Sequence, residues 1–280
     1  FSLAGLKVIE IQHHWAHVAS VLAENGIAGA VIGLVCDGTG YGTDGAIWGC
    51  ECLIASLEKF ERFGHLAYYD LPGADKASKE AIRPLLALLK KAYGDEFELS
   101  EFEWLLGRIE ADLTKQQVIL EQIEKGVNTV RTSSAGRVFD AVAAILGMGS
   151  YNHFDAQLPM ALEAIIETGV DPVRNSPLVM LGVGPGISNG VEDRYDYELV
   201  NRPGEPVKLD LSKMIRELIG DVRAEVASGV ISAKFHNCLA AGLLEMAEAA
   251  RQATRLNTAA LSGGVFCNGY LTNRIVKLLD

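Results

Sequence analysis

Two histidines one helical turn apart, His13 and His17, are the side chains whose type and spacing most directly suggest chemistry. Residues 13–24 have the pattern of a helix, and Asn25-Gly26 is a typical helix stop. Side chains four residues apart lie on one face of a helix, so both imidazoles can bind one metal ion. A pair of solvated or hydrogen-bonded histidines is the structural alternative.

The same helix predicts which side chains face the core. Trp15, Val18 and Leu22 fall roughly opposite the two imidazoles, so we expect those histidines to point away from the core. His14 lies about 100° from their shared face. We expect it to act catalytically, either by supporting the metal ligands or by touching a substrate.

Asp37 is the third candidate metal ligand. It ends a β-branched run, residues 31–37, and precedes the Gly-rich segment 38–45. Strand ends beside such loops place side chains in clefts, and glycines let backbone N–H groups approach an anion. The candidate donors are Gly38, Thr39, Gly40 and Thr43. A hairpin without a catalytic role remains the alternative for this segment.

The pattern of the chain predicts an α/β fold. Residues 31–37, 46–55 and 60–69 form three candidate strands, and the short links between them favour an antiparallel meander. After Pro72-Gly73 the apolar periodicity becomes helical and continues to about residue 146.

Later segments predict two helices and a second glycine turn. Residues 211–219 and 223–252 have helical patterns, and the longer one carries an apolar stripe. That stripe consists of Phe235, Leu239, Leu243 and Met246. The Gly-rich residues 178–188 are interpreted as a turn. Residues 259–266 read as a strand followed by a Gly-Gly turn into a helix at 270–279, an arrangement that binds nucleotides in α/β proteins.

Composition excludes several functional classes. The chain has 280 residues and a net charge of −11, which disfavours a nucleic-acid partner. No apolar run reaches the roughly 18 residues of a membrane span. The cysteines, Cys36, Cys50, Cys52, Cys238 and Cys267, form no C-x-x-C pair, so we expect reduced thiols in the cytoplasm. Because Phe1 is not a natural start, we expect a piece of a longer protein.

Six segments together resemble one known family. They are His13-His-Trp-Ala-His17, Cys36-Asp-Gly-Thr-Gly-Tyr-Gly-Thr-Asp-Gly-Ala-Ile-Trp-Gly49, Leu71-Pro-Gly-Ala-Asp-Lys76, Ser133-Ser-Ala-Gly-Arg-Val-Phe-Asp-Ala-Val142, Lys234-Phe-His-Asn237 and Leu261-Ser-Gly-Gly-Val-Phe-Cys-Asn268. In this order they resemble the carboxy-terminal module of the HypF carbamoyltransferases, which mature NiFe hydrogenases.

The resemblance implies a fold and a reaction. The fold would be the actin, sugar-kinase and Hsp70 type (ribonuclease H-like), with residues 1–29 as a remnant of a first lobe. Residues 30–280 would form the second, nucleotide-binding lobe, with a helical insertion at about 73–148. The reaction would pass a carbamoyl group from carbamoyl-adenylate, derived from carbamoyl phosphate and ATP, to the C-terminal cysteine thiol of the partner HypE.

The resemblance also implies site residues and cofactors. His13, His17 and Asp37 would hold a divalent metal, Zn²⁺ or Fe²⁺, with Mg²⁺ as a further candidate. Asp37 would also be catalytic, and the Gly38 to Gly45 loop would face phosphate. The adenosine and ribose would be met by Gly136, Asp140, Asp155, Ser262, Gly263, Gly264 and Asn268.

The chain departs from the family pattern in places. The family usually has Tyr-Glu-Gly-Gln where this chain has Phe154-Asp-Ala-Gln157, so the acidic side chain is one methylene shorter. The family's closing Asn-Asp-Gly-Gly segment, with a further metal ligand, is expected beyond Asp280.

Three other functions remain as alternatives to carbamoyl transfer onto HypE. They are a tRNA threonylcarbamoyl transferase subunit, a small-molecule O-carbamoyltransferase, and a noncatalytic nucleotide-binding lobe that docks partners.

Overall fold

The structure is a computed structural model that describes residues 8–168 and 193–279. The expected turn at 178–188 lies outside the described residues. The strands are β1 (Val31–Tyr41), β2 (Ile47–Ala55), β3 (Phe60–Leu66), β4 (Tyr69–Pro72), β5 (Thr129–Thr132), β6 (Glu198–Val200), β7 (Val207–Asp210) and β8 (Ala259–Ser262). The α-helices are α1 (His13–Glu24), α2 (Ile82–Tyr93), α3 (Glu103–Ile109), α4 (Leu113–Lys125), α5 (Ala135–Ile145), α6 (Gln157–Thr168), α7 (Ser212–Arg223), α8 (Ser228–Thr254) and α9 (Gly269–Leu279).

The strands form one mixed sheet. β1, β2 and β3 pair antiparallel in sequence order, and β8 adds parallel to the free side of β1. On the other side β7 pairs parallel with β3, and β6 pairs antiparallel with β7. The β4–β5 pair joins this sheet through a single parallel contact between Ile47 and Thr132.

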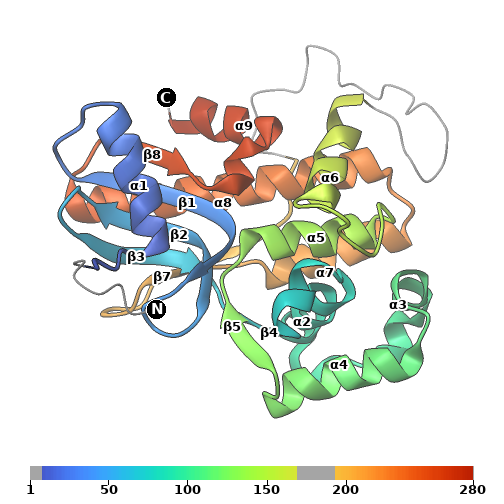
Figure 1. The fold of residues 1–280 in the computed structure, drawn as a ribbon. Coiled ribbons are helices and arrows are strands. Elements are labelled where there is room, and N and C mark those ends of the chain that lie inside the picture. Colours follow the sequence, from blue (N-terminus) through green and yellow to red (C-terminus); the bar gives the residue numbers. More distant parts are fainter. Residues whose placement is uncertain (1–7, 169–192, 280) are drawn as a thin grey trace.

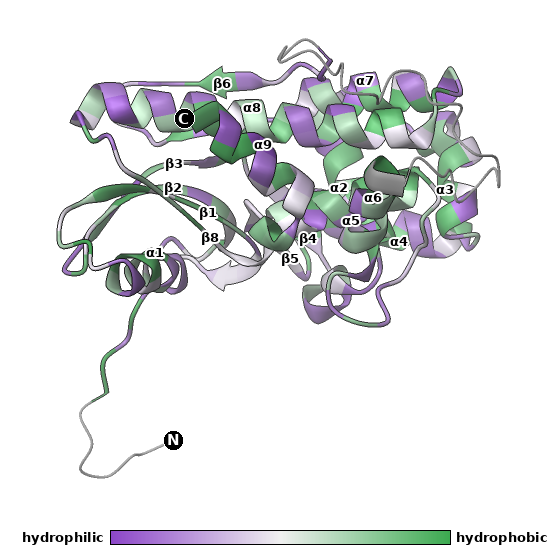
Figure 2. Cartoon of the chain, turned by 90° about the horizontal axis from the view of Figure 1, so that it is seen from above, coloured by the Kyte–Doolittle hydropathy of each residue, from purple (hydrophilic) through white to green (hydrophobic). Residues whose placement is uncertain are grey.

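Helices cover both faces of the sheet, so the central strands are buried on both sides. Figure 2 shows α1 and α8 on opposite sides of β1, β2 and β3. Alternation along β1 divides its side chains between the two layers. Val31 and Val35 pack with Val18 of α1, whereas Ile32 and Leu34 belong to the larger core under the other helices.

The remaining helices form a second body of structure beside the sheet (Figure 1). α2, α5, α6 and α8 pack against one another there, and their apolar faces make most of the larger core. The expected stripe of α8 is confirmed, because Phe235, Leu239, Leu243 and Met246 are all buried.

Several expected elements are confirmed and others need correction. The three-strand meander and the helix at 13–24 are present. β1, however, continues through the glycines to Tyr41, with an irregular register between Cys36 and Gly40. The expected helical insertion at 73–148 is interrupted by β5, which pairs with β4 and is stabilised by that partner. Helix α6 and strands β6 and β7 were not predicted.

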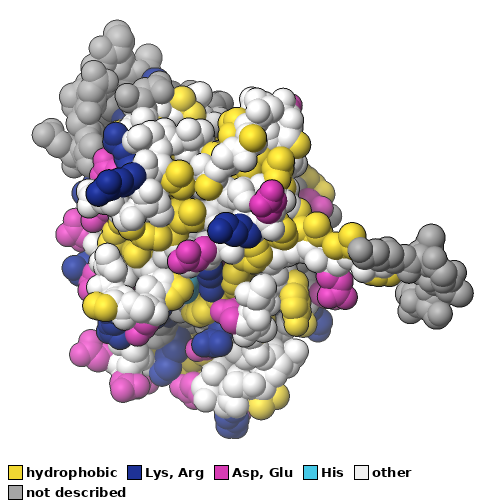
Figure 3. Space-filling model, turned by 90° about the vertical axis from the view of Figure 1, so that its left-hand side faces the viewer, with side chains coloured by type: hydrophobic (Ala, Val, Ile, Leu, Met, Phe, Trp, Pro, Cys, Tyr) yellow, Lys and Arg dark blue, Asp and Glu magenta, His cyan; other side chains and the backbone are white. Residues whose placement is uncertain are grey.

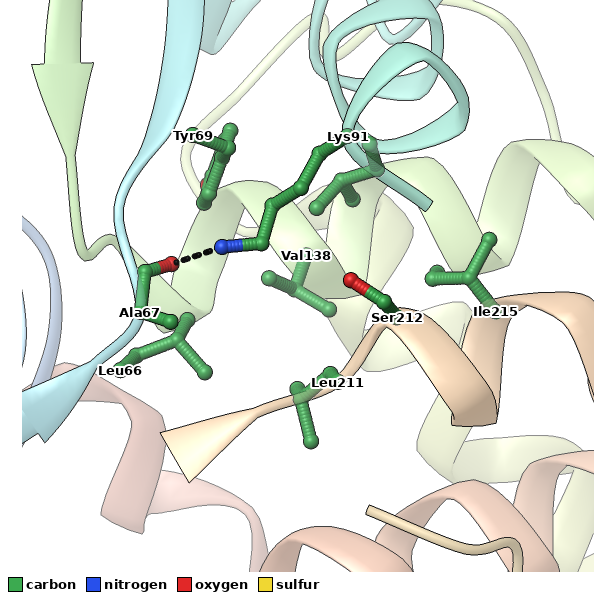
Figure 4. A pocket seen from close by; sticks show the side chains of 9 residues that line it. Leu66, Ala67, Tyr69, Lys91, Val138, Leu211, Ser212 and Ile215 are labelled. Atoms are coloured by element: carbon green, nitrogen blue, oxygen red, sulfur yellow. Dashed lines mark hydrogen bonds between the residues drawn. The ribbon is translucent and has the colours of Figure 1, made fainter. Parts of the chain in front are cut away.

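A half-buried lysine ties the helical body to the sheet. Lys91 of α2 donates to the carbonyls of Ala67 and Tyr68, at 3.1 and 2.7 Å, where β3 leads into β4 (Figure 4). Asp210 at the end of β7 lies 3.3 Å from the Lys91 ammonium. Burial lowers the pKa of Lys91, and the Asp210 carboxylate opposes this effect. The lysine of α2 therefore satisfies polar groups of the β3–β4 link and of β7 at one point.

Two further features are the charge distribution on the surface and the length of the helices. Lys and Arg side chains are interspersed with Asp and Glu on the face shown in Figure 3, where no basic patch gathers. Within the two described ranges, every helix is too short or too polar to cross a lipid bilayer.

Candidate functional site

Helix α1 is held in place at its start and along its side. The Gln12 side chain caps it by accepting from the Trp15 N–H at 2.8 Å, and its amide donates to the Tyr41 carbonyl at the end of β1. The Trp15 indole N–H donates to the Ser56 carbonyl after β2. These bonds fix the first turn of the helix over the second half of β1, where Asp37 lies.

The two histidines converge on one carboxylate oxygen. Asp37 Oδ2 lies 3.1 Å from His13 Nε2 and 3.2 Å from His17 Nε2. One ligand atom from each of the three side chains lies within 4.8 Å of the others. Two ligands of one tetrahedral Zn²⁺, each bound at about 2.0–2.1 Å, are about 3.3 Å apart. The three side chains therefore fit a shared divalent cation with small adjustments, in agreement with their spacing in the sequence.

Neighbouring groups orient two of these ligands. The Ser262 hydroxyl, at the end of β8, lies 3.1 Å from His17 Nδ1, the ring nitrogen that faces away from Asp37. The other oxygen of Asp37 accepts the Gly38 N–H at 2.7 Å. Burial pushes the pKa of Asp37 upward, but this bond and the two histidines outweigh burial and lower it. Asp37 is therefore held as a carboxylate, the form that binds cations.

His14 does not take the expected position. It is fully buried and, with Val18 and Leu22, forms the stripe of α1 that faces the sheet. Its ring packs beside Trp48 and against Gly40, where an added Cβ would come within 2.4 Å of it. Burial, helped by His13, lowers the pKa of His14 to about 3. The expected substrate contact by His14 is therefore wrong for this arrangement. The buried stripe of α1 consists of residues 14, 18 and 22, which are spaced by four. This spacing includes His14 and leaves out Trp15.

Asp37 also forms part of the wall of a cleft. The cleft has a volume of about 630 Å³, within the usual range for small-molecule sites. It is lined by the end of β1 (Asp37, Gly38, Thr39), Ser78, the start of α5 (Gly136, Arg137, Phe139), α6 and its approach (Asp155, Ala156, Pro159, Met160, Glu163) and the segment before α9 (Gly264, Val265, Cys267, Asn268). The candidate metal ligands are thus adjacent to a space large enough for a nucleotide.

Six of the expected nucleotide residues line this cleft and four do not. Those that line it are Gly38, Thr39, Gly136, Asp155, Gly264 and Asn268. Gly40 packs on the imidazoles, and Ser262 supports His17. Gly263 has a φ of +100°, and a Cβ there would lie 2.3 Å from the Cys36 carbonyl oxygen. These structural contacts replace the expected contact with phosphate for Gly40 and the expected contact with adenosine for Ser262 and Gly263.

Asp140 also lies behind the cleft wall. It is fully buried, accepts from the Asn152 amide at 2.9 Å and lies 2.7 Å from Arg137 Nε. Burial raises the pKa of Asp140 to about 6, although Arg137 opposes the shift. A direct ribose contact would need an exposed carboxylate, so the expected role of Asp140 is corrected to pairing with Arg137.

The start of α5 lies against the Gly38 loop. Ser134 caps the helix by accepting from the Arg137 N–H, and its hydroxyl donates to the Gly38 carbonyl at 2.6 Å. A Cβ on Gly136 would lie 2.8 Å from the Gly38 Cα, so only glycine allows this approach. Just before the cap, the Ser133 hydroxyl donates to Glu51, which is fully buried on β2.

The start of α9 is closed, contrary to expectation. The Glu163 carboxylate of α6 accepts from the N–H groups of Gly269 and Tyr270, at 2.6 and 3.2 Å. The Asn268 side chain accepts from the Leu271 N–H at 2.8 Å. These bonds take the N–H groups that were expected to face a ligand. The helix starts that remain at the cleft wall are those of α5, with Gly136 and Arg137, and of α6, with Asp155 and Ala156 just before it.

Sequence reasoning missed several residues of the cleft, among them Arg137, Glu163 and Cys267. Arg137 lies within one of the six segments that resemble the family, but the sequence assigned roles only to its neighbours Gly136 and Asp140. Its spacing of three from Asp140 was a signal for an ion pair on one helix face. Glu163 and Cys267 gave no usable signal, because α6 was not predicted and Cys267 is one of five unpaired cysteines.

Comparisons with known proteins give consistent results. Residues 33–280 match the family model described as carbamoyltransferase, Kae1-like domain, second subdomain. The chain is 32% identical to the carbamoyltransferase HypF of Synechocystis over 98% of its length, and 33% identical to a HypF homologue of Cupriavidus necator over 95%. It spans 34% of the former protein and 62% of the latter.

Two solved structures share the fold. A crystal structure of full-length HypF in a phosphate- and nucleotide-bound form superposes with a TM-score of 0.83 and 34% identity, covering 99% of this chain and 32% of that one. The structure of T. kodakarensis HypF gives a TM-score of 0.77 and 30% identity, covering 98% of this chain and 33% of that one. Both cover the sheet, the helical body and the cleft described above.

Proposed function

The chain belongs to the HypF carbamoyltransferase family, and on that basis we propose that it transfers a carbamoyl group from carbamoyl-adenylate to a cysteine thiol at the C-terminus of the partner protein HypE. In this reaction a thiolate attacks the carbamoyl carbon, the bond to the phosphate oxygen breaks and AMP leaves. The products are a thiocarbamate and AMP, and the thiol proton passes to solvent.

One observation carries the proposal. Asp37 belongs both to the metal-ligand set and to the cleft wall, with one oxygen beside the two histidines and the other beside Gly264. A nucleotide in the cleft would therefore bring its reacting end next to the metal-ligand set. This arrangement suits a reaction on a phosphate-linked carbonyl group better than it suits a docking lobe.

His13, His17 and Asp37 would hold the divalent metal, and Ser262 would orient His17 from behind. Imidazole and carboxylate ligands suit both Zn²⁺ and Fe²⁺, with Mg²⁺ as a weaker fit to a histidine pair. Such an ion supplies Lewis acidity at the reacting carbonyl or phosphate. The side chain of His13 is 45% exposed, so the site is open on the side from which an acceptor thiol would arrive.

The cleft residues would bind and orient the adenylate. Gly38 and Gly136 let two backbone segments come close together, which leaves room for a phosphate beside them. Asp155 remains the proposed ribose ligand, since its exposed carboxylate lines the cleft. Burial of the adenylate in this cleft would limit the access of water, which would otherwise compete with the thiol.

The finer fold and domain assignments belong to the same proposal. Three antiparallel strands followed by a parallel β8 support the actin, sugar-kinase and Hsp70 (ribonuclease H-like) type. The division into 1–29 and 30–280 stays a prediction, as does the cytoplasmic location suggested by five free cysteines.

The test uses synthetic carbamoyl-adenylate and three acceptors: a peptide ending in cysteine, a tRNA and a small alcohol. Mass spectrometry should detect carbamoylation of the peptide thiol and little on the other two. The same peptide ending in serine is the matched control for the thiol. Preferential modification of the tRNA or the alcohol, or no transfer to any acceptor, would contradict the proposal.

A further inference from the structure

Arg137 is the one basic side chain among the described residues that line the cleft. The other charged lining residues are Asp37, Asp155 and Glu163. An anionic ligand would be repelled over most of the wall and attracted at one end only. That end is the start of α5, where the side chain of Arg137 is 13% exposed.

The guanidinium of Arg137 has hydrogen-bond donors to spare. Its Nε is fully buried and, among the described residues, has no hydrogen-bond acceptor. Asp140 Oδ2 lies 2.7 Å away and compensates the charge, but that contact lacks hydrogen-bond geometry. Because Nε is enclosed beside Asp140, a ligand in the cleft would meet the terminal Nη groups of the guanidinium, whose hydrogen bonds to an anion are charge-assisted and strong.

The guanidinium is also directed toward the loop at the end of β1. Its Nη2 lies 3.7 Å from the position that a Cβ on Gly38 would occupy. Gly136, the residue before Arg137, also packs on Gly38, since a Cβ added to it would lie 2.8 Å from the Gly38 Cα. The cation, the loop and the first turn of α5 thus surround one small volume at the end of the cleft.

We propose that this volume is an oxyanion subsite in which Arg137 binds a phosphate group, with Asp140 as the residue that positions the guanidinium. The inference rests on the nucleotide-binding part of the proposed function and assigns an orientation within it. The phosphate of the nucleotide lies at the α5 end, beside Gly38. The uncharged part extends toward the apolar side chains of Ala156, Pro159 and Met160 on the α6 side.

The opposite orientation is disfavoured by charge. A phosphate on the α6 side would face Asp155 and Glu163, with no cation among the lining residues described there. A planar guanidinium that offers several donors can bind two phosphate oxygens at once, which a lysine cannot do.

The experiment compares AMP and adenosine, which differ only in the phosphate. Their dissociation constants are measured by calorimetry for the native chain, Arg137→Met and Arg137→Lys. Arg108→Met, an exposed position on α3, is the control for net charge. Thermal unfolding of each variant verifies that the fold is retained.

We expect Arg137→Met to weaken AMP binding by about 10- to 100-fold, the usual effect of losing charged hydrogen bonds, and to change adenosine binding by less than about twofold. Arg137→Lys should recover part of the loss, and Arg108→Met should bind like the native chain. Inorganic phosphate should compete with AMP and not with adenosine.

The subsite alone would be overturned if a folded Arg137→Met lost equal affinity for AMP and adenosine, or lost affinity for neither. A native chain that binds neither ligand would overturn the proposed nucleotide site and the subsite with it.

Discussion

The amide Nδ2 of Asn268 donates to Nε2 of His236 across 2.9 Å, inside the core between α8 and α9. The other ring nitrogen, Nδ1, carries the proton and donates to the Ser232 carbonyl at 2.7 Å. Because Asn268 caps α9 and also lines the cleft, the neutral ring of His236 determines where this side chain lies. Within the segment Lys234-Phe-His-Asn237, His236 therefore acts on the cleft through Asn268.

This neutral histidine predicts a pH dependence of stability. Burial lowers the pKa of His236 to about 4, so the unfolded chain takes up a proton at a higher pH than the folded chain. Its contribution to stability is full above about pH 6.5 and is lost as the pH falls toward 4. Between pH 7 and pH 5 the free energy of unfolding should decrease by about 2 kcal/mol through this group.

Urea unfolding at both pH values tests this prediction. His236→Gln should be less stable at pH 7 and should show a smaller decrease on going to pH 5. Part of the decrease should remain, because burial also lowers the pKa of His65 to about 4. His153→Gln, at an exposed position, is the control. An unchanged decrease in His236→Gln would show that His236 does not titrate in this way.

Loss of one imidazole should remove the metal. His17→Ala deletes one of three ligands that converge within 4.8 Å, and two ligands are too few for tight binding. Elemental analysis after dialysis should detect a clear fall in metal content in His17→Ala and in His13→Ala. His153→Ala should keep the native content. The metal site would be refuted by equal content in all four proteins.

Ser262→Ala should weaken metal binding without abolishing it. The hydroxyl touches His17 Nδ1 and is not a ligand, so its loss frees the ring to rotate. Groups that orient metal-binding histidines typically affect metal affinity by about 10- to 100-fold. Competition with a chelator would measure the shift, and Ser20→Ala, which loses only a bond within α1, should produce none.

Gly136→Ala should destabilise the chain and weaken nucleotide binding. The new methyl group would lie 2.8 Å from the Cα of Gly38, and two backbone segments would have to separate. Overpacking of this kind costs about 1–3 kcal/mol. Gly107→Ala is the matched control: it lies in α3 with no atom within 4 Å of the new methyl group, so it should be neutral or stabilising. Chemical unfolding and AMP calorimetry on both variants would distinguish the two positions.

Local patterns were sufficient to predict the elements that carry the metal ligands. The bounds of α1 and the meander follow from periodicity and turn residues. Asp37 was selected because it precedes the Gly-rich segment, although β1 continues past it to Tyr41. The pattern failed for β4 and β5, four residues each, which are too short to display alternation and which depend on each other for pairing. Contacts between segments that are distant in the chain could not be predicted from the sequence either. Glu163 caps a helix that begins 106 residues later, and no local rule relates the two.

The ligands of the candidate metal site are close in sequence as well as in space. His13 and His17 lie 24 and 20 residues before Asp37, whereas Ser262 follows His17 by 245 residues. Short loops close quickly and at low entropic cost, while distant contacts form late. We therefore expect α1 and β1 to bring the three metal ligands together early in folding, before Ser262 reaches them. Ser262 completes the arrangement only when β8 joins β1, so the early site would exchange its ion more readily than the mature one.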